Sequence, residues 1–119
     1  MSSDTTAVRY AGIDIGSRTI KLVVVDERGT TLETFQADTG FDPMATANEL
    51  IEKTSFDRIM ATGYGRNLFE LSFDAPTVTE IKAHARGAWA EFPDARTVLD
   101  IGGQDSKAIA LFENGRVKK

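Results

Sequence analysis

Two segments of the sequence combine an aspartate, a glycine turn and a lysine in the same order. The first is DIGSRTIK, residues 14–21, and the second is DIGGQDSK, residues 100–107. Each aspartate lies in an apolar run typical of a strand, so the glycines predict a turn where that strand ends. Glycine turns can direct successive backbone N–H groups at an anion such as phosphate. The two segments are therefore candidate anion-binding loops.

The same segments form an internal repeat at an offset of 86 residues. A few matches are expected by chance, since hairpins share composition. Here, however, aspartate, glycine, lysine and a closing glycine fall in one register, which favours a duplicated strand–turn–strand–turn unit. The second copy reaches only its second turn. The pairs that match without a gap are Asp14/Asp100, Ile15/Ile101, Gly16/Gly102, Lys21/Lys107, Glu27/Glu113 and Gly29/Gly115.

The aspartates suggest what chemistry the loops would perform. A carboxylate repels phosphate unless a cation lies between them, and Mg²⁺ accepts one or two carboxylates together with waters and phosphate oxygens. Asp14 and Asp100 are the predicted magnesium residues, and Ser17 and Gln104 add side-chain donors. The lysines could neutralise further charge or could be solvated strand positions. One such turn is weak evidence, whereas two in one register predict a pair of phosphate clamps facing one nucleotide.

Other residues with possible chemistry have simpler explanations. His84, the only histidine, lies beside the apolar stripe of a predicted helix and is expected to pack there rather than catalyse. Glu80 is explained by a capping box with Thr77. Arg66 follows GYG and could reach an anion or a partner. Three further residues alternate as an apolar stretch expected in the core or a subunit contact: Phe69, Leu71 and Phe73.

The elements that must position the loops follow from hydrophobic periodicity and turn residues. Asp42-Pro43 is typical of a helix start. The predicted order is three strands, a helix, a strand, a helix and a strand. An α/β fold with a mixed sheet, a three-strand meander and helices packed on it is therefore expected. The predicted ranges are 8–15, 20–26, 30–37, 43–53, 57–62, 78–91 and 97–101.

Composition excludes several classes of function. The 119 residues carry a net charge of −4, which argues against sequence-independent binding of nucleic acid. The longest apolar run, residues 22–25, is too short to span a membrane, and the first residues lack a signal-peptide core, so the cytoplasm is the expected location. The sequence contains no cysteine, which excludes disulfides, thiol catalysis and Cys-ligated clusters from this chain alone.

Four motifs occur in the order found in one family: AGIDIGSRTIKLVVVD, ATGYGR, EIKAHARGA and VLDIGGQDSKAI. From about Tyr10 to Val117 the sequence resembles the ATPase activators of 2-hydroxyacyl-CoA dehydratases and the related ATPase subunits of benzoyl-CoA reductases. These belong to the superfamily of actin, sugar kinases and heat-shock chaperones. The DxG pattern is generic to that superfamily, whereas the other motifs together are much more specific.

The resemblance implies two ribonuclease-H-like halves that enclose Mg-ATP. Residues 1–7 would be a disordered lead-in, residues 8–101 the first half, and residues 102–119 the start of the second. Asp14 and Asp100 would hold Mg²⁺ through water, and one of them or Gln104 would orient the attacking water. The phosphate loops implied by the resemblance contain Gly16, Ser17 and Lys21 in the first and Gly102, Gly103 and Gln104 in the second.

The resemblance also implies partners. Such activators form homodimers that share one [4Fe-4S] cluster and use ATP to drive low-potential electron transfer to a dehydratase or reductase. This chain supplies no ligand cysteines, so it is expected to be a shortened form that hydrolyses ATP poorly by itself. Two alternatives remain open. One is half of an N-acetylglucosamine-type kinase, which would need a sugar-binding insertion; the other is a non-catalytic fragment that assembles through a strand beginning near Ser106.

Overall fold

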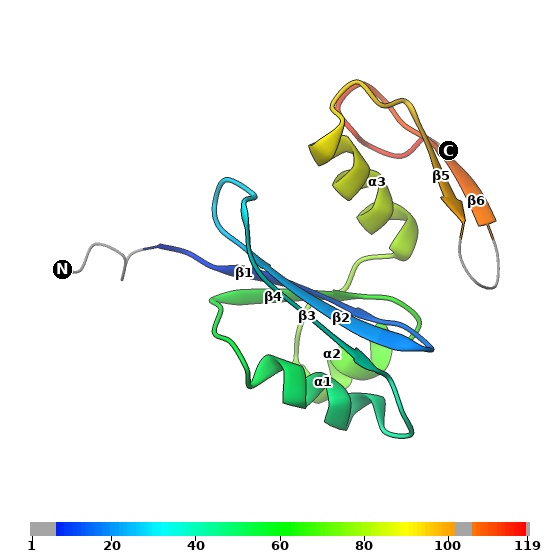
Figure 1. Cartoon of the computed structure of the whole chain (residues 1–119). Helices are drawn as coiled ribbons and strands as arrows, with labels where there is room; N and C mark the ends of the chain where they lie inside the picture. Colours follow the sequence, from blue (N-terminus) through cyan, green and yellow to red (C-terminus); the bar gives the residue numbers. More distant parts are fainter. Residues whose placement is uncertain (1–6, 102–105, 119) are drawn as a thin grey trace. The chain divides into compact units, whose positions relative to one another are not determined.

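The computed structural model describes residues 7–101 and 106–118, and its chain divides into two compact units, residues 1–78 and 79–119 (Figure 1). Each unit is described by itself. The elements of the first are β1 (Tyr10–Ile15), β2 (Thr19–Val25), β3 (Thr31–Asp38), α1 (Pro43–Ile51), β4 (Arg58–Thr62) and α2 (Arg66–Phe73). Those of the second are α3 (Glu80–Glu91), β5 (Thr97–Ile101) and β6 (Ser106–Ala110).

The first unit is built on a four-stranded sheet with the order β3-β2-β1-β4. Strands β1, β2 and β3 are antiparallel neighbours, and β4 runs parallel to β1 on its other side. The predicted meander and the predicted mixed sheet are both confirmed. Because parallel strands end at the same edge of a sheet, the segments after β1 and after β4 leave the sheet side by side.

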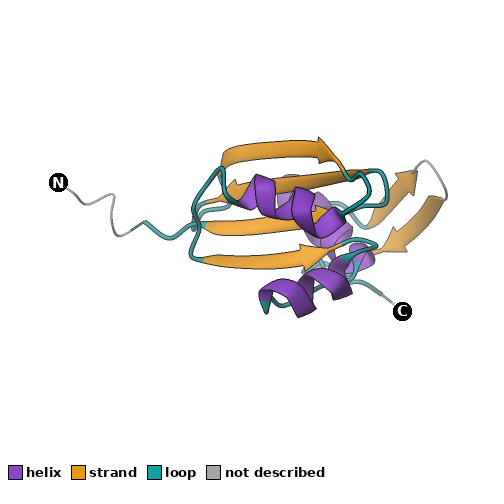
Figure 2. Ribbon diagram, turned by 90° about the horizontal axis from the view of Figure 1, so that it is seen from below, coloured by secondary structure: helices purple, strands orange, loops and turns teal. Residues whose placement is uncertain are grey.

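The two helices of this unit lie on one face of its sheet (Figure 1), and Figure 2 shows them in front of the strands. The strands alternate, so every second side chain of β1 and β2 points into the core under the helices. Burial of this one face stabilises the unit, while Asp14 and Lys21 project from the opposite face. The buried core residues include Ala11, Ile13, Ile15, Ile20, Leu22, Val24, Ala47, Leu50, Ala61 and Phe69.

Helix α1 begins as the sequence predicts, whereas α2 was not predicted. The Asp42 carboxylate accepts from the Ala45 N–H at 3.2 Å and so caps α1. The stretch predicted as alternating apolar residues is helical instead: Phe69 and Phe73, four residues apart, stack with ring centroids 4.5 Å apart. Leu71, between them, is 84% exposed. Helical spacing brings the first two together, and the intervening residue points away.

Helix α3 is predicted correctly in type, but its cap is Thr79 rather than Thr77. Thr79 has an extended backbone, and its hydroxyl accepts from the Lys82 N–H at 3.3 Å. Thr77 instead forms a parallel bridge with Ala61 at the edge of β4. Because Thr77 is held in this sheet bridge, the chain is still strand-like two positions before the cap Thr79. The capping-box prediction with Thr77 was therefore wrong.

The second unit packs α3 against the antiparallel hairpin of β5 and β6. Its core consists of Ala85, Ile109 and Leu111, with Trp89 and Val98 packed against them. Two large apolar residues near the ends of this helix, Ile81 and Phe92, are 42% and 69% exposed. Strand β5 pairs with β6 in a sheet of its own, and the boundary predicted after Ile101 remains a prediction. No helix in the described part of the chain is long and apolar enough to cross a membrane.

Candidate functional site

The first candidate site lies at the carboxyl ends of β1 and β4. Asp14 is the cross-strand partner of Lys21 on β2 and of Thr62 on β4. Residues directly opposite each other project from the same face of a sheet, so the carboxylate, the ammonium and the hydroxyl share the face opposite the core. Ligands of open α/β sheets bind outside the carboxyl ends of parallel strands. Asp14 is therefore on the edge where such a ligand is expected.

The TGYGR segment packs directly against this aspartate. Gly63 adopts a φ of +97°, and a Cβ built on it would overlap Asp14 Oδ1 and lie 2.7 Å from the Ile15 carbonyl oxygen. The Gly65 N–H donates to the same Ile15 carbonyl at 2.9 Å, and a Cβ at Gly65 would overlap the Ile15 side chain. Only glycine fits at Gly63, because a side chain there would require both a strained backbone and a displaced carboxylate.

The role of these glycines was missed in the sequence. The signal was present, because β4 was predicted and the sheet was predicted to be mixed. A strand parallel to β1 carries its following loop to the turn after Asp14. Arg66, whose role the sequence left open, donates from its guanidinium to the Gly63 carbonyl at 3.1 Å. In this structure the arginine thus holds the TGYGR bend closed.

The turn after β1 is closed by its own backbone. The Gly16 N–H donates to the Thr19 carbonyl at 3.0 Å, so this amide is engaged within the turn. On the other side of the turn, the hydroxyl of Thr39, a 4% exposed side chain, donates to the Gly16 carbonyl at 2.8 Å. The Thr39 N–H donates to the Arg18 carbonyl at 2.9 Å. Ser17 is exposed at the tip, where its hydroxyl faces solvent.

The second candidate site lies at the end of β5. The Asp100 carboxylate has its cross-strand partner Lys107 at 3.6 Å from Oδ2, and His84 Nδ1 from α3 at 3.2 Å from the same oxygen. The His84 contact has ion-pair distance without the direction of a hydrogen bond, because this nitrogen is buried with no hydrogen-bond partner. The remaining predicted residues of this loop, Gly102, Gly103 and Gln104, lie outside the described residues.

The two hairpins have the same hydrogen-bonding register. Every β5–β6 pair, from Thr97↔Ala110 to Ile101↔Ser106, has a β1–β2 counterpart at an offset of 86 residues. The following turns also match: the N–H groups of Gly29 and Gly115 each donate at 3.0 Å to the carbonyl three residues earlier, at φ of +84° and +86°. Asp14 and Asp100 therefore occupy equivalent positions in the strand pairing of the two hairpins, although Ile13 and Ile15 are buried while Leu99 and Ile101 are 66% and 74% exposed.

The donor set fits a magnesium ion held largely by water and phosphate. In residues 7–101 and 106–118, no group of three or more His, Cys, Asp or Glu side chains is arranged to hold a metal. Zinc and calcium sites built from the protein alone require such groups. Mg²⁺ bound to a nucleotide needs only one or two carboxylates, so a single aspartate in either unit is compatible with that ion. Residues 7–101 and 106–118 therefore do not provide a complete set of protein ligands for a metal ion.

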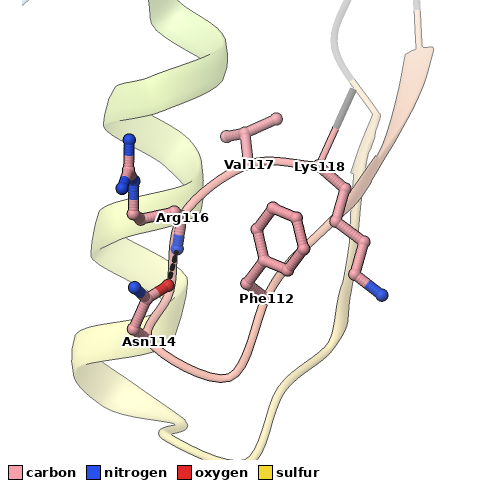
Figure 3. A pocket seen from close by; sticks show the side chains of 5 residues that line it. All are labelled: Phe112, Asn114, Arg116, Val117 and Lys118. Atoms are coloured by element: carbon pink, nitrogen blue, oxygen red, sulfur yellow. Dashed lines mark hydrogen bonds between the residues drawn. The ribbon is translucent and has the colours of Figure 1, made fainter.

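Two pockets are lined by residues other than the predicted site residues. One is lined by Phe112, Asn114, Arg116, Val117 and Lys118 (Figure 3). There the Lys118 ammonium lies 5.4 Å from the centroid of the Phe112 ring, and Asn114 Oδ1 accepts from the Arg116 N–H at 3.1 Å. The other surrounds an ion pair between Arg9 and Glu33, before the start of β1 and thus at the opposite end of that strand from Asp14.

The Glu33 carboxyl in this second pocket is held in its ionised form by its neighbours. The Thr54 hydroxyl donates a hydrogen bond to Glu33 and lowers the pKa of this carboxyl. The neighbouring Arg9 guanidinium lowers the pKa further, while desolvation opposes both. The cluster ties the segment before β1 to β3 and to the loop after α1, which is a structural role.

The mixed sheet with its parallel β1–β4 pair has the actin-like ATPase fold, as does the solved structure of the (R)-2-hydroxyglutaryl-CoA dehydratase component A from Acidaminococcus fermentans, with a TM-score of 0.78 at 30% identity. That fold also occurs in a ROK family protein of Streptococcus pneumoniae, which is 16% identical with a TM-score of 0.66, a likeness that concerns the fold alone. A model of the BadF/BadG/BcrA/BcrD ATPase family matches residues 11–119. The chain belongs to this family.

Named relatives are consistent with that assignment. The activator of lactoyl-CoA dehydratase from Anaerotignum propionicum is 37% identical over 91% of this chain, and a benzoyl-CoA reductase subunit from Thauera aromatica is 33% identical over 91%. A solved structure of the 2-hydroxyisocaproyl-CoA dehydratase activator from Clostridium difficile with bound ADPNP has a TM-score of 0.74 at 32% identity, covering 96% of this chain. The chain spans 44%, 42% and 44% of these three proteins, respectively.

Proposed function

We propose that this chain is the N-terminal nucleotide-binding half of an ATP-driven activator. In that role, binding and hydrolysis of Mg-ATP are coupled to low-potential electron transfer to a 2-hydroxyacyl-CoA dehydratase or a benzoyl-CoA reductase in the cytoplasm. Family membership supports the ATPase class, and the names of the relatives support the kind of partner. The relative solved with bound ADPNP supports the nucleotide as ligand.

The observation that carries the proposal is the matched pair of hairpins. Two aspartates occupy the same register, and each lies opposite a lysine on the neighbouring strand. In this proposal, each aspartate–lysine pair binds one end of the same polyphosphate. A hairpin whose only task is to close a sheet needs neither the aspartate nor the lysine. Each copy would contribute its own carboxylate to the same Mg-ATP.

Each residue of the first loop has a defined task in this proposal. Asp14 would hold magnesium through water, and Gly63 and Arg66 keep its carboxylate and the adjacent bend in place. Gly16 shapes the turn, Ser17 donates to a phosphate oxygen, and Lys21 neutralises phosphate charge. In the second loop, Gly102, Gly103 and Gln104 would have the corresponding tasks beside Asp100.

Phosphoryl transfer to water requires mostly positioning and neutralisation of charge. Magnesium, when bound, would supply positive charge beside the phosphate oxygens. Asp14, Asp100 or Gln104 accepts a hydrogen bond from the attacking water and so orients it toward the terminal phosphate. The lysines act by electrostatic attraction and do not exchange protons with the substrate.

The electron-transfer part of the proposal requires groups that this chain does not supply. A [4Fe-4S] cluster is held by cysteine thiolates, and the sequence has no cysteine. The residues present therefore do not fit that cluster, and no step is assigned to it. The homodimer implied by the family and the choice of acyl-CoA partner are likewise proposals about the whole activator.

A calorimetric titration of the chain with Mg-ADPNP tests the nucleotide-binding proposal, because this analogue is not hydrolysed. The wild type is expected to bind, and Asp14→Ala is expected to weaken binding at least tenfold, with Asp26→Ala in the following turn as a matched control. Binding that persists unchanged in Asp14→Ala would refute the metal role of that residue. Absence of binding by the folded wild type would refute the proposed function of this chain by itself.

A further inference from the structure

We propose that His84 is a positioning residue that fixes the Asp100 carboxylate at the end of β5 through its Nδ1–H. The proposal rests on the proposed function, because it assigns His84 a role in presenting a magnesium-associated carboxylate. His84 is the only histidine of the chain. Its expected role as a helix-packing residue leaves its polar atoms unexplained.

The contact is specific to one atom of the ring. Nδ1 is buried and has no hydrogen-bond partner of good geometry, yet it lies 3.2 Å from Asp100 Oδ2. A buried imidazole nitrogen without a partner is unfavourable. Contacts of this kind are often poorly aligned before ligand binds and tighten when it does. A small rotation of either side chain would direct the Nδ1–H at the carboxylate without moving the backbone.

The two neighbours of Asp100 differ in what they can do. Lys107 reaches the same oxygen at 3.6 Å from the adjacent strand, as a flexible ammonium with three donors. His84 approaches from α3 on a rigid ring with one nitrogen in range. A flexible cation can neutralise the carboxylate, but a ring held by a helix can also fix its orientation. In this proposal, Lys107 neutralises the charge of the Asp100 carboxylate and His84 fixes its orientation.

In the first hairpin, a different kind of neighbour restricts the aspartate side chain. There, Asp14 is confined by the backbone of Gly63, where even a Cβ would overlap the carboxylate. The second hairpin has His84 in contact with its aspartate. Both aspartates thus have a lysine across the strand and a second neighbour from a separate motif, TGYGR for Asp14 and EIKAHARGA for Asp100. The two neighbours are placed differently, because Gly63 belongs to the loop after β4 whereas His84 lies on the helix that packs against its own hairpin. The role of His84 therefore rests on the 3.2 Å contact itself.

The contact can be tested directly by NMR, because a single histidine gives unambiguous signals. Long-range ¹H–¹⁵N spectra of the 119-residue chain, recorded at alkaline pH where the ring is neutral, distinguish the Nδ1–H from the Nε2–H tautomer. The wild type is expected to show mainly the Nδ1–H form, and Asp100→Ala is expected to lose that preference. The same tautomer mixture in both proteins would overturn the proposal.

Two substitutions separate positioning from packing. Asparagine places its side-chain N–H₂ where His84 has Nδ1, whereas glutamine places it farther along, near Nε2. His84→Asn is therefore expected to bind Mg-ADPNP within about twofold of wild type, and His84→Gln about tenfold more weakly. Lys82→Gln, exposed on the same helix, is the control and should bind as wild type does.

Equal losses of Mg-ADPNP affinity in His84→Asn and His84→Gln would overturn the positioning role, since packing alone does not distinguish the two ring nitrogens. Failure of the folded wild type to bind Mg-ADPNP would refute the proposed function and with it the role of His84 in presenting a metal-associated carboxylate. The tautomer measurement would still decide whether the His84–Asp100 contact exists. The two failures are therefore distinguishable.

Discussion

Replacement of Gly63 by alanine tests the arrangement at the first aspartate most sharply. The backbone of Gly63 has a φ of +97°, which an L side chain rarely adopts, and the new Cβ would overlap Asp14 Oδ1 and crowd Ile15 N and O at 2.8 and 2.7 Å. The strained backbone costs about 1–3 kcal/mol. Overpacking against backbone atoms costs about 1–3 kcal/mol more. We expect Gly63→Ala to lower the free energy of unfolding of the first unit by about 2–6 kcal/mol.

Two other glycines provide matched controls for the separate costs. Gly29 has a φ of +84° with nothing within 4 Å of a built Cβ, so Gly29→Ala measures backbone strain alone. Gly12 has neither a positive φ nor a neighbour in that range, and Gly12→Ala should be close to neutral. The difference between Gly63→Ala and Gly29→Ala, about 1–3 kcal/mol, isolates the contact with Asp14 and Ile15.

Urea denaturation followed by circular dichroism gives the stability of each variant, and hydrogen exchange of β1 amides assigns it to the first unit. Fluorescence is unsuitable, because Trp89, the only tryptophan, lies in the other unit. Gly63→Ala should also weaken Mg-ADPNP binding more than Gly29→Ala does, since only the former displaces Asp14. If the two variants unfold at the same urea concentration, the close packing of TGYGR against Asp14 is refuted.

Three further predictions concern the helices, the second turn and pH. Thr79→Ala should lower the free energy of unfolding of the second unit by about 1 kcal/mol through loss of the helix cap, as measured by urea denaturation. Thr77→Ala should lower it by less. A larger loss in Thr77→Ala than in Thr79→Ala would show that Thr77 is the cap. Gly115→Ala, with a φ of +86° and a Cβ that would lie 2.6 Å from the tryptophan ring, should shift the tryptophan emission and destabilise this unit. Gly87→Ala, on an open helical surface, should instead stabilise it by up to about 1 kcal/mol, and similar effects of the two would contradict the structure. Because the pKa of Glu33 is lowered on folding, its stabilising contribution is present above the ordinary glutamate pKa, about 4.3, and is lost as pH falls through the folded pKa. Glu33→Gln should therefore lose less stability than wild type between pH 7 and pH 3 in urea titrations, and equal losses would refute the assignment.

Much of the fold could be predicted because local signals agreed with tertiary packing. The alternation in β1, the apolar run of β2, the turn at Gly29 and the Asp42-Pro43 start of α1 each depend on neighbours close in sequence. The failures have a common cause. Residues 66–73 form a helix because Phe69 is buried in the core and Phe73 stacks on it, and Thr77 is held by a bridge to β4. Neither fact is visible in a short window of sequence.

In the candidate site, too, features set by local sequence could be predicted and features set by tertiary contacts could not. The equivalence of Asp14 and Asp100 could be predicted because a repeat keeps its own register, and the structure places both in matching hairpins. The parallel strand indicated that the loop after β4 lies near Asp14, but the atomic contacts of Gly63 and His84 with the two aspartates could not be predicted, since both residues approach from other elements. Their positions depend on the path of the chain after β4 and on the rotation of α3 about its axis. Sequence spacing constrains neither quantity closely enough to predict an atomic contact.

The central claim is that the two hairpins are copies of one phosphate-binding structure and act on the same nucleotide. Titration of the ¹⁵N-labelled chain with Mg-ADPNP, followed by amide chemical shifts, tests it most directly. We predict that amides in the β1–β2 turn and at the ends of β5 and β6 shift together, with one dissociation constant, and that EDTA reverses both changes. Shifts confined to one hairpin, or shifts that persist after the metal is removed, would contradict the claim.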